Sequence, residues 1–152
     1  MAETSLLYAG IGSRDTPLYI QIIMRRTALG LGRAGWTLRS GGARGADSAF
    51  IEGAQAGKHP IEVFTKGANY EAMTIAAKNH PAWERCDPYA RDLLGRNVHI
   101  LLGPKLVEPV RFVLCWTDSL SRSGTAHACR VAHAFNIPVV NLWHEGKGVK
   151  DG

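Results

Sequence analysis

Short apolar runs alternate with longer segments of helical periodicity along this chain. The runs are typical of buried strands and fall at residues 5–10, 36–39, 61–65, 111–116 and 137–142. The segments between them predict helices at residues 17–34, 48–56, 70–79, 88–97 and 125–135. Strands that alternate with helices in this way form βαβ units with right-handed crossovers. The pattern therefore predicts an α/β protein with a mainly parallel sheet.

Two of the predicted helices carry a clear apolar stripe, which we expect to face the core. The first stripe consists of Ile20, Ile23, Met24, Thr27 and Leu31, and the second of Ala128, Val131, Ala132 and Phe135. The pattern loosens over residues 66–110, which we expect to be a variable region that caps a pocket or makes a dimer contact. Within it, residues 98–102 fit either an extension of the preceding helix or a further strand. Residues 144–152 predict a frayed polar tail.

Length, charge and cysteine content narrow the class of protein. The 152 residues suffice for one domain with a substantial core and are too few for two, so we expect a single domain over residues 1–152. The formal charge of +5 favours anionic partners, nucleic acid among them. Three cysteines without a C-x-x-C pair favour a reducing compartment. Since neither a signal peptide nor a membrane-spanning run is present, we predict a cytoplasmic protein with no membrane partner.

Three turns rich in glycine and serine follow predicted strands, and each contains one arginine. The turns are residues 10–15, 40–47 and 121–125, and the arginines are Arg14, Arg44 and Arg122. Glycine lets the backbone approach a ligand closely, and the N–H groups at a following helix start attract negative charge. Because turns after the carboxyl ends of parallel strands lie along one edge of the sheet, we expect these turns to line one pocket for a phosphate-bearing ligand.

Cofactor and metal motifs are incomplete. The first turn begins Gly10-Ile11-Gly12 but lacks the third glycine of G-x-G-x-x-G, and the second strand ends without the carboxylate that holds a ribose. A Walker A motif is also missing. These departures exclude an ordinary NAD dehydrogenase, and we expect no cofactor. His127 and His133 are six positions apart and do not share a helix face, and no other spacing is typical of a metal site, so we expect no bound metal.

The three turns together resemble those of the SLOG superfamily. The resemblance rests on Gly12-Ser13-Arg14, on the segment Ser40–Asp47 and on Ser123-Gly124-Thr125, and it covers nearly the whole chain in the same motif order. This superfamily includes the DNA-processing protein DprA, the LOG-type phosphoribohydrolases and small stand-alone DprA-like proteins, some of them carried by phages. The element G-x-A-R-G-x-D looks particularly like DprA. The resemblance implies a single Rossmann-like, three-layer domain with helices on both faces of the sheet.

The resemblance also implies which residues touch a ligand. They lie in or beside the three turns and comprise Gly10, Gly12, Ser13, Arg14, Ser40, Gly41, Gly42, Arg44, Gly45, Asp47, Thr117, Asp118, Ser123, Gly124 and Thr125. In this picture the start of the last predicted helix holds a phosphate, and Asp118 meets a ribose hydroxyl. The ligand would be a nucleotide, a nucleotide-derived sugar phosphate or a DNA phosphate.

One departure from the superfamily bears on catalysis. The phosphoribohydrolases carry P-G-G-x-G-T-x-x-E, whose glutamate helps to cleave an N-glycosidic bond, and Ala128 stands at the position of that glutamate here. Glycoside cleavage needs a carboxylate to stabilise the developing oxocarbenium ion or to position water. Asp47, Glu84 and Asp118 are the candidates for a substitute. Asp47 fits equally well as a helix cap, and His127 is a further candidate acid or base.

Three functions follow from these features. The sequence favours binding of a nucleotide, an ADP-ribose-like molecule or a ribosyl phosphate, because the turns are intact while the glutamate is missing. The first alternative is a nucleoside monophosphate phosphoribohydrolase of LOG type that uses a displaced carboxylate. The second is DprA-like binding of single-stranded DNA, favoured by G-x-A-R-G-x-D and the positive charge. We also expect a homodimer, with Trp83 and Tyr89 as candidate contacts.

Overall fold

The computed structural model describes residues 5–118 and 123–143. Its centre is one five-stranded sheet in the order β3-β2-β1-β4-β5, and every neighbouring pair is parallel. The strands are β1 (Leu7–Gly12), β2 (Thr37–Ser40), β3 (Ile61–Val63), β4 (Phe112–Trp116) and β5 (Val139–Asn141). The strand order reverses direction between β1 and β4. In parallel sheets, ligands bind at the carboxyl ends of the strands beside such a reversal.

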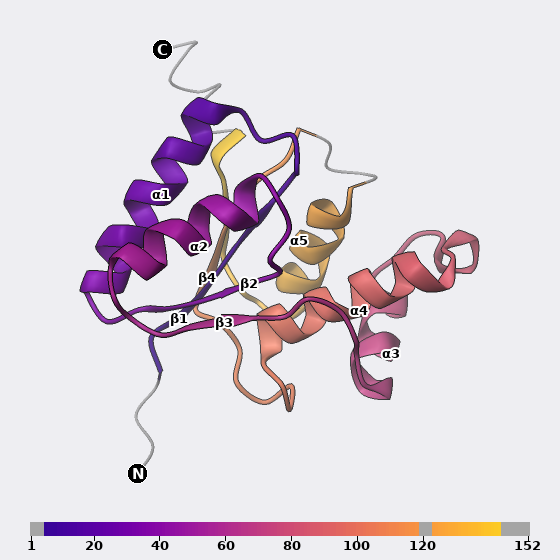
Figure 1. The fold of residues 1–152 in the computed structure, drawn as a ribbon. Helices are drawn as coiled ribbons and strands as arrows, with labels where there is room; N and C mark the ends of the chain where they lie inside the picture. The colour runs from indigo at the N-terminus through magenta and orange to yellow at the C-terminus, as the bar shows by residue number, and fades with distance from the viewer. Residues whose placement is uncertain (1–4, 119–122, 144–152) are drawn as a thin grey trace.

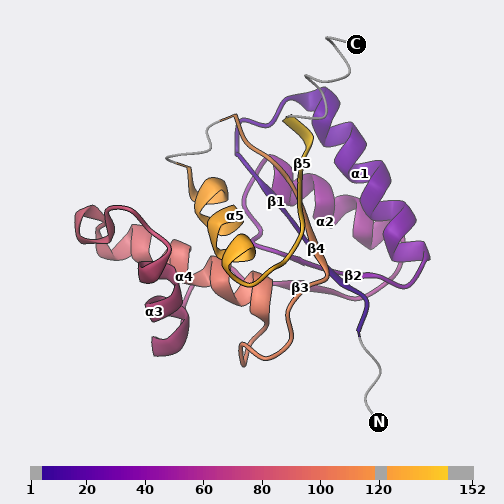
Figure 2. The same cartoon turned by 180° about the vertical axis from the view of Figure 1, so that it is seen from behind.

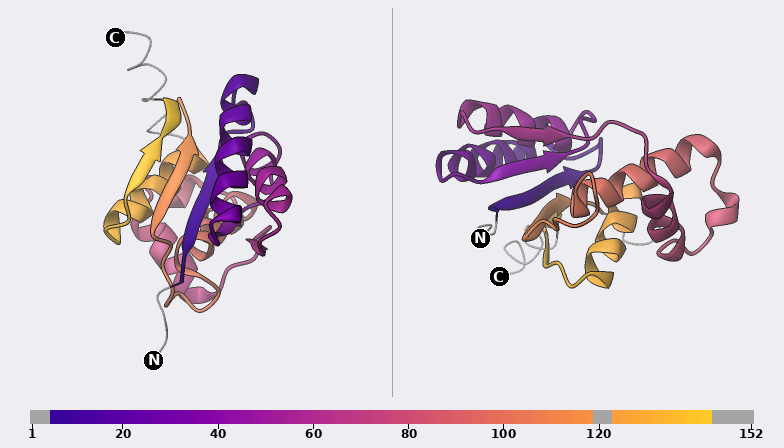
Figure 3. Two further views of the ribbon diagram at one scale, coloured as in Figure 1. Left: turned by 90° about the vertical axis from the view of Figure 1, so that its left-hand side faces the viewer. Right: turned by 90° about the horizontal axis from the view of Figure 1, so that it is seen from below.

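Helices cover both faces of this sheet (Figure 1). α1 (Leu18–Arg33) and α2 (Ala46–Ala56) lie on one face, and α4 (Pro88–Leu102) and α5 (Gly124–Ala134) lie on the other, as the right-hand view in Figure 3 shows. α3 (Tyr70–Lys78) packs against α4, and a short 3-10 helix, η1 (Trp83–Arg85), connects the two. The predicted α/β, Rossmann-like architecture is confirmed. Over the described residues, no helix combines the length and apolar character needed to span a bilayer.

Residues 98–102 extend α4 and do not form a strand. Val98, Ile100, Leu101 and Leu102 are all nearly inaccessible to solvent. α4 packs against the sheet and against α3 and α5. Its last turns are therefore buried on several sides, and the apolar residues of this segment do not follow the helical period. The helix ends at Gly103, whose φ of 90° lies in the region that glycine tolerates best.

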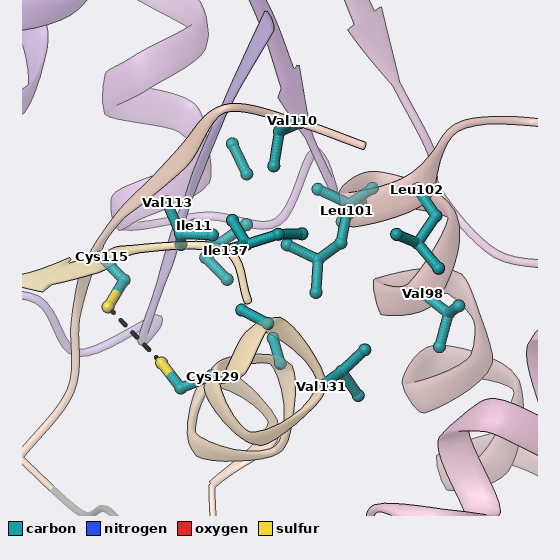
Figure 4. Close-up of a cluster of buried hydrophobic side chains, with 14 of the residues drawn as sticks. Ile11, Val98, Leu101, Leu102, Val110, Val113, Cys115, Cys129, Val131 and Ile137 are labelled. Carbon is teal, nitrogen blue, oxygen red and sulfur yellow. Dashed lines mark hydrogen bonds between the residues drawn. The ribbon is translucent and has the colours of Figure 1, made fainter. Parts of the chain in front are cut away.

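The core consists of two clusters, one on each face of the sheet. Figure 4 shows the cluster between the sheet and helices α4 and α5, where Val113, Val131 and Ile137 meet. The sulfur atoms of Cys115 and Cys129 lie 3.8 Å apart inside it. The second cluster lies between the sheet and helices α1 and α2. Figure 2 shows the first of these faces, with α5 beside β4 and β5.

Two positions in the predicted stripes are wrong. Ile23 is 45% exposed, because the buried side of α1 follows Ile20, Met24, Ala28 and Gly32 at intervals of four residues. Phe135 is 43% exposed, because α5 ends at Ala134 and Phe135 no longer follows the helical phase. The other members of both stripes are buried or half-buried.

Candidate functional site

A cleft of about 360 Å³ lies at the carboxyl ends of β1 and β4, where the strand order reverses. Each of the three predicted turns contributes to it. The residues from these turns that line the cleft are Ile11, Gly12, Ser13, Arg14, Asp15, Ala43, Asp47, Ser123, Gly124 and Thr125. Segments far apart in the sequence therefore meet at the edge of the sheet where sequence reasoning expects a ligand.

The first turn is held against β4 and the start of α2. The Ser13 N–H donates to the Trp116 carbonyl at 3.1 Å, and the Ser13 carbonyl accepts from the Thr16 hydroxyl at 2.6 Å and the Ala46 N–H at 3.3 Å. A Cβ atom on Gly12 would lie 2.6 Å from the Ala46 Cβ and 2.9 Å from the Trp116 carbonyl oxygen. Only glycine fits this contact, so the turn has a fixed backbone position.

The second turn packs on the first through Gly45. Gly45 has a φ of 82°, and a Cβ atom there would lie 2.7 Å from the carbonyl oxygens of both Ser13 and Arg14. Gly45 is also the N-cap of α2, with Asp47 in the first turn of that helix. Asp47 is therefore not the N-cap residue, although an acidic side chain at this helix end is favourable.

The Asp47 carboxylate holds the second turn together from inside. The side chain is only 4% exposed, and Oδ2 accepts the Ala43 N–H at 3.1 Å. Burial raises the pKa of Asp47 from 3.8 to about 6, while hydrogen bonds from the Ala43, Gly12 and Gly41 backbones and the charge of Arg96 oppose the rise. The carboxylate thus accepts its hydrogen bonds from the surrounding backbone.

Arg96 brings a second positive charge to the cleft from α4. Its Nη1 donates to the Gly41 carbonyl at 2.9 Å and to the Phe64 carbonyl at 3.1 Å. Burial lowers the pKa of Arg96, the negative charge of Asp47 raises it, and the positive charge of Arg14 lowers it further. Arg14 and Arg96 both line the cleft, so two positive side chains contribute to the same site.

Sequence reasoning expected residues 66–110 to cap a pocket or make a dimer contact, but assigned no ligand residue to α4. This helix adds Leu93, Leu94, Arg96, Asn97 and Ile100 to the lining of the cleft. The Asn97 side-chain amide also donates to the Gly124 carbonyl at 3.2 Å, which ties α4 to the third turn. The helical spacing of these α4 residues predicts that they share one face of the helix. It does not predict which part of the protein that face contacts.

The third turn presents the start of α5 to the cleft. Ser123 is the N-cap, and its hydroxyl oxygen accepts the Ala126 N–H at 2.9 Å and lies 3.1 Å from the Thr117 hydroxyl. Gly124 and Thr125 occupy the first helical positions and line the cleft. Their N–H groups belong to the first turn and have no acceptor within the helix, so this end of the helix offers donors and a partial positive charge to an anion.

The remaining predicted ligand residues lie outside the cleft lining. They are Gly10, Ser40, Gly41, Gly42, Arg44, Gly45, Thr117 and Asp118, and the candidate acid Glu84 is outside it as well. Several of them support the turns, as when the Ser40 hydroxyl donates to the Gly10 carbonyl at 2.6 Å. Arg44, Asp118 and Glu84 are exposed. Arg122 lies outside the described residues.

Two positions on α5 were considered for catalysis, Ala128 where the phosphoribohydrolases carry a glutamate and His127 as an acid or base, and neither lines the cleft. Ala128 is buried in the core between α5 and the sheet, so this position brings no carboxylate to a ligand. His127 is fully buried, with Nε2 2.9 Å from the Ala76 carbonyl and its ring 5.6 Å from that of His80. It therefore packs toward α3. In residues 5–118 and 123–143, no three His, Cys, Asp or Glu side chains form a group suited to a metal ion.

The burial of His127 predicts a pH-dependent stability. Burial lowers the pKa of His127 from 6.5 to about 4, with a smaller opposing effect of the Ala76 carbonyl. Between pH 6.5 and pH 4 the unfolded chain binds a proton at His127 that the folded protein does not bind. The contribution of His127 to the free energy of unfolding therefore decreases by about 3 kcal/mol as the pH is lowered through this range. His127→Gln keeps a donor for Ala76 and does not titrate. Urea unfolding at pH 7 and pH 4 should show the wild-type advantage shrinking, and a constant difference would contradict the prediction.

Comparisons with known proteins identify a similar fold. No family model matches the chain, and no curated protein matches it. Among solved structures, DNA processing protein A from Helicobacter pylori, which binds single-stranded DNA, superposes with a TM-score of 0.64 at 22% sequence identity. The match covers 91% of this chain, which spans 65% of that protein. At this identity the similarity shows the fold, and the predicted DprA-like fold is confirmed.

Proposed function

We propose that this protein binds single-stranded DNA, with backbone phosphates in the cleft between Arg14, Arg96 and the start of α5. The observation that carries the proposal is that two arginines, Arg14 and Arg96, line one cleft together with the N-terminus of α5. A phosphate in the cleft interacts favourably with both arginines and accepts hydrogen bonds from the N–H groups at the start of α5. The fold similarity to a protein that binds single-stranded DNA supports a nucleic acid as the source of the phosphate.

The charge balance of the cleft favours an anion. Two acidic residues line it, but Asp47 is buried and accepts hydrogen bonds from the backbone. The lining thus holds two arginines and two acids, and the N-terminus of α5 adds the partial positive charge that favours an anion. A chain with a formal charge of +5 adds a weak long-range attraction for a polyanion.

A free nucleotide or ribosyl phosphate is the second candidate ligand. It is favoured by the cleft volume of about 360 Å³, which lies in the range of sites for small molecules. Hydrolysis of such a ligand has less support, because neither Asp118 nor Glu84 lines the cleft. The third candidate, Asp47, does line it, but its carboxylate is buried and accepts hydrogen bonds from the backbone of the second turn. We therefore propose binding and no bond cleavage.

Replacing Arg14 tests the proposal. Arg14→Ala should weaken binding of a fluorescently labelled oligothymidine by about tenfold, and should reduce the slope of log affinity against log salt by about one. Fluorescence anisotropy at several salt concentrations measures both quantities. Arg33→Ala is the matched control, because Arg33 is exposed in the last turn of α1 and does not line the cleft. Equal effects of the two variants would contradict a phosphate site at Arg14.

Competition distinguishes the two candidate ligands. If DNA is the ligand, affinity should rise with oligonucleotide length, and nucleoside monophosphates should displace the label only at far higher concentrations, since each offers one phosphate. Displacement by a monophosphate at concentrations similar to the oligonucleotide, without dependence on length, would favour the small ligand. Both outcomes are read in the same anisotropy assay.

A further inference from the structure

Two of the three cysteines face each other inside the core. The Sγ atoms of Cys115, in β4, and Cys129, in α5, lie 3.8 Å apart, and Figure 4 shows the two side chains pointing toward one another. Both are free thiols. A disulfide bond brings its sulfur atoms to about 2 Å, so each sulfur has to move by only about 1 Å to form one. The pair is therefore positioned for a cross-link between strand and helix.

The two thiols differ in exposure and in acidity. Cys115 is completely buried, whereas 7% of Cys129 is exposed. The hydrogen bond between them lowers the pKa of the Cys129 thiol, burial opposes this effect, and the positive charge of Arg130 adds to it. The same hydrogen bond, together with burial, raises the pKa of the Cys115 thiol. The thiolate of the pair therefore forms on Cys129, which is also the thiol that a small molecule reaches from solvent.

We propose that Cys115 and Cys129 are an oxidation site, at which hydrogen peroxide produces a reversible intramolecular disulfide. The Cys129 thiolate attacks one oxygen of the peroxide, the O–O bond breaks, and a sulfenic acid forms on Cys129. The hydroxide that leaves takes up the proton released when Cys129 ionised and becomes water. The Cys115 sulfur then attacks the sulfenic sulfur, forms the S–S bond and displaces a second water. Two thiols and one peroxide thus give one disulfide and two waters.

The disulfide joins two elements that also form the cleft. Cys115 is paired in register with Ile11 of β1, and Ile11 lines the cleft. Cys129 follows Thr125 by one turn of α5, and Thr125 lines the cleft as well. The bond therefore ties α5, whose first turn offers its N–H groups to an anion, to the strand beside it. The cysteines are 14 positions apart, so the bond also closes a loop of the chain that contains the third turn.

Thiol labelling after oxidation tests the proposal. Cys86 is half-buried, and its Sγ lies 3.6 Å from His80 Nε2. Cys86→Ser removes this third thiol, which is able to link two molecules, and serves as the parent protein. After peroxide treatment and denaturation in N-ethylmaleimide, the parent should take up no label and be about 2 Da lighter, and dithiothreitol should restore two labels. Two labels after peroxide would overturn the proposal.

Single variants of the parent protein test the order of the steps. Cys115→Ala leaves Cys129 without the thiol that resolves its sulfenic acid, so dimedone, which traps sulfenic acids, should label Cys129. Cys129→Ala is the matched control, because Cys115 is completely buried and should stay unlabelled over the same time. Label on Cys115 in preference to Cys129, or no label in either variant, would overturn the order.

Glutathione buffers test whether the fold positions the two thiols. The ratio of disulfide to dithiol at equilibrium gives the effective concentration of one thiol at the other. This concentration should be more than about tenfold higher in the native parent protein than in concentrated urea, because the fold holds the sulfur atoms 3.8 Å apart. Equal values, or loss of the native circular dichroism spectrum on oxidation, would contradict the proposal. None of these measurements uses DNA, so the result is independent of the proposed DNA binding.

Discussion

Asp47→Ala is expected to lower the free energy of unfolding by about 3 kcal/mol and to weaken oligonucleotide binding at least tenfold. The carboxylate is buried and accepts hydrogen bonds from the backbones of Ala43, Gly12 and Gly41. Alanine leaves these N–H groups without their acceptor and leaves the half-buried Arg96 without its negative neighbour. Because Gly12, Ala43 and Arg96 line the cleft, stability and binding should fall together.

Chemical denaturation and anisotropy measure the two effects separately. Glu71→Ala is the matched control, because Glu71 is an exposed acidic residue in the first turn of α3, and its loss should change stability by less than about 0.5 kcal/mol. Asp47→Asn keeps the shape and one acceptor oxygen, and should therefore cost less than alanine. A stable Asp47→Ala protein with wild-type binding would refute the structural role of this carboxylate.

The raised pKa of Asp47 adds a check on the same variants. The pKa is about 6 in the folded protein against an ordinary value of 3.8, so the folded protein takes up a proton between these pH values that the unfolded chain does not bind. The contribution of Asp47 to stability therefore rises as the pH falls from 6 to 3.8, opposite to that of His127. Asp47→Asn should lack this component of the pH dependence.

Arg39→Ala is expected to destabilise the protein by about 3 kcal/mol while leaving oligonucleotide binding unchanged in the folded protein. Arg39 is completely buried in β2, where Nε donates to Glu62 Oε1 at 2.6 Å, Nη1 to the Glu108 carbonyl at 2.6 Å and Nη2 to Glu108 Oε1 at 3.0 Å. It thereby joins β2 to β3 and to the segment before β4. Alanine leaves a cavity and an unpaired carbonyl.

The solvent exposure of the partners of Arg39 determines which lost interactions account for the loss of stability in Arg39→Ala. The side chains of Glu62 and Glu108 are 43% and 53% exposed, so water can solvate both carboxylates once the arginine is gone. Most of the cost should then come from lost packing and from the Glu108 carbonyl. Arg39→Met refills much of the volume and should recover about half of the loss. Urea unfolding checks this order, and a change below about 1 kcal/mol for alanine would contradict it.

The local pattern predicted the elements of the fold well, because each strand and helix has its own periodicity and turn residues. It predicted the first, second and third turns at one edge of the sheet, and Gly12, Ser13, Arg14 and Gly124 do line one cleft. It left Arg96 and Asn97 in a region that either caps a pocket or makes a dimer contact, since helical spacing places residues on a common face without saying which other element that face meets. The ambiguity at residues 98–102 has the same origin, because burial on several sides removes the period.

By itself, the sequence determined the order of elements, the parallel sheet and the positions of the turns that carry Gly12, Ser13 and Gly124, because these depend on interactions between residues close together in the chain. The tertiary structure alone decided that Asp47 is buried, that Arg96 lines the same cleft as Arg14, and that Ile23 is exposed. These properties depend on which surfaces meet after the chain has folded. Burial and charge proximity are set by packing between distant segments, and no local pattern encodes that packing directly.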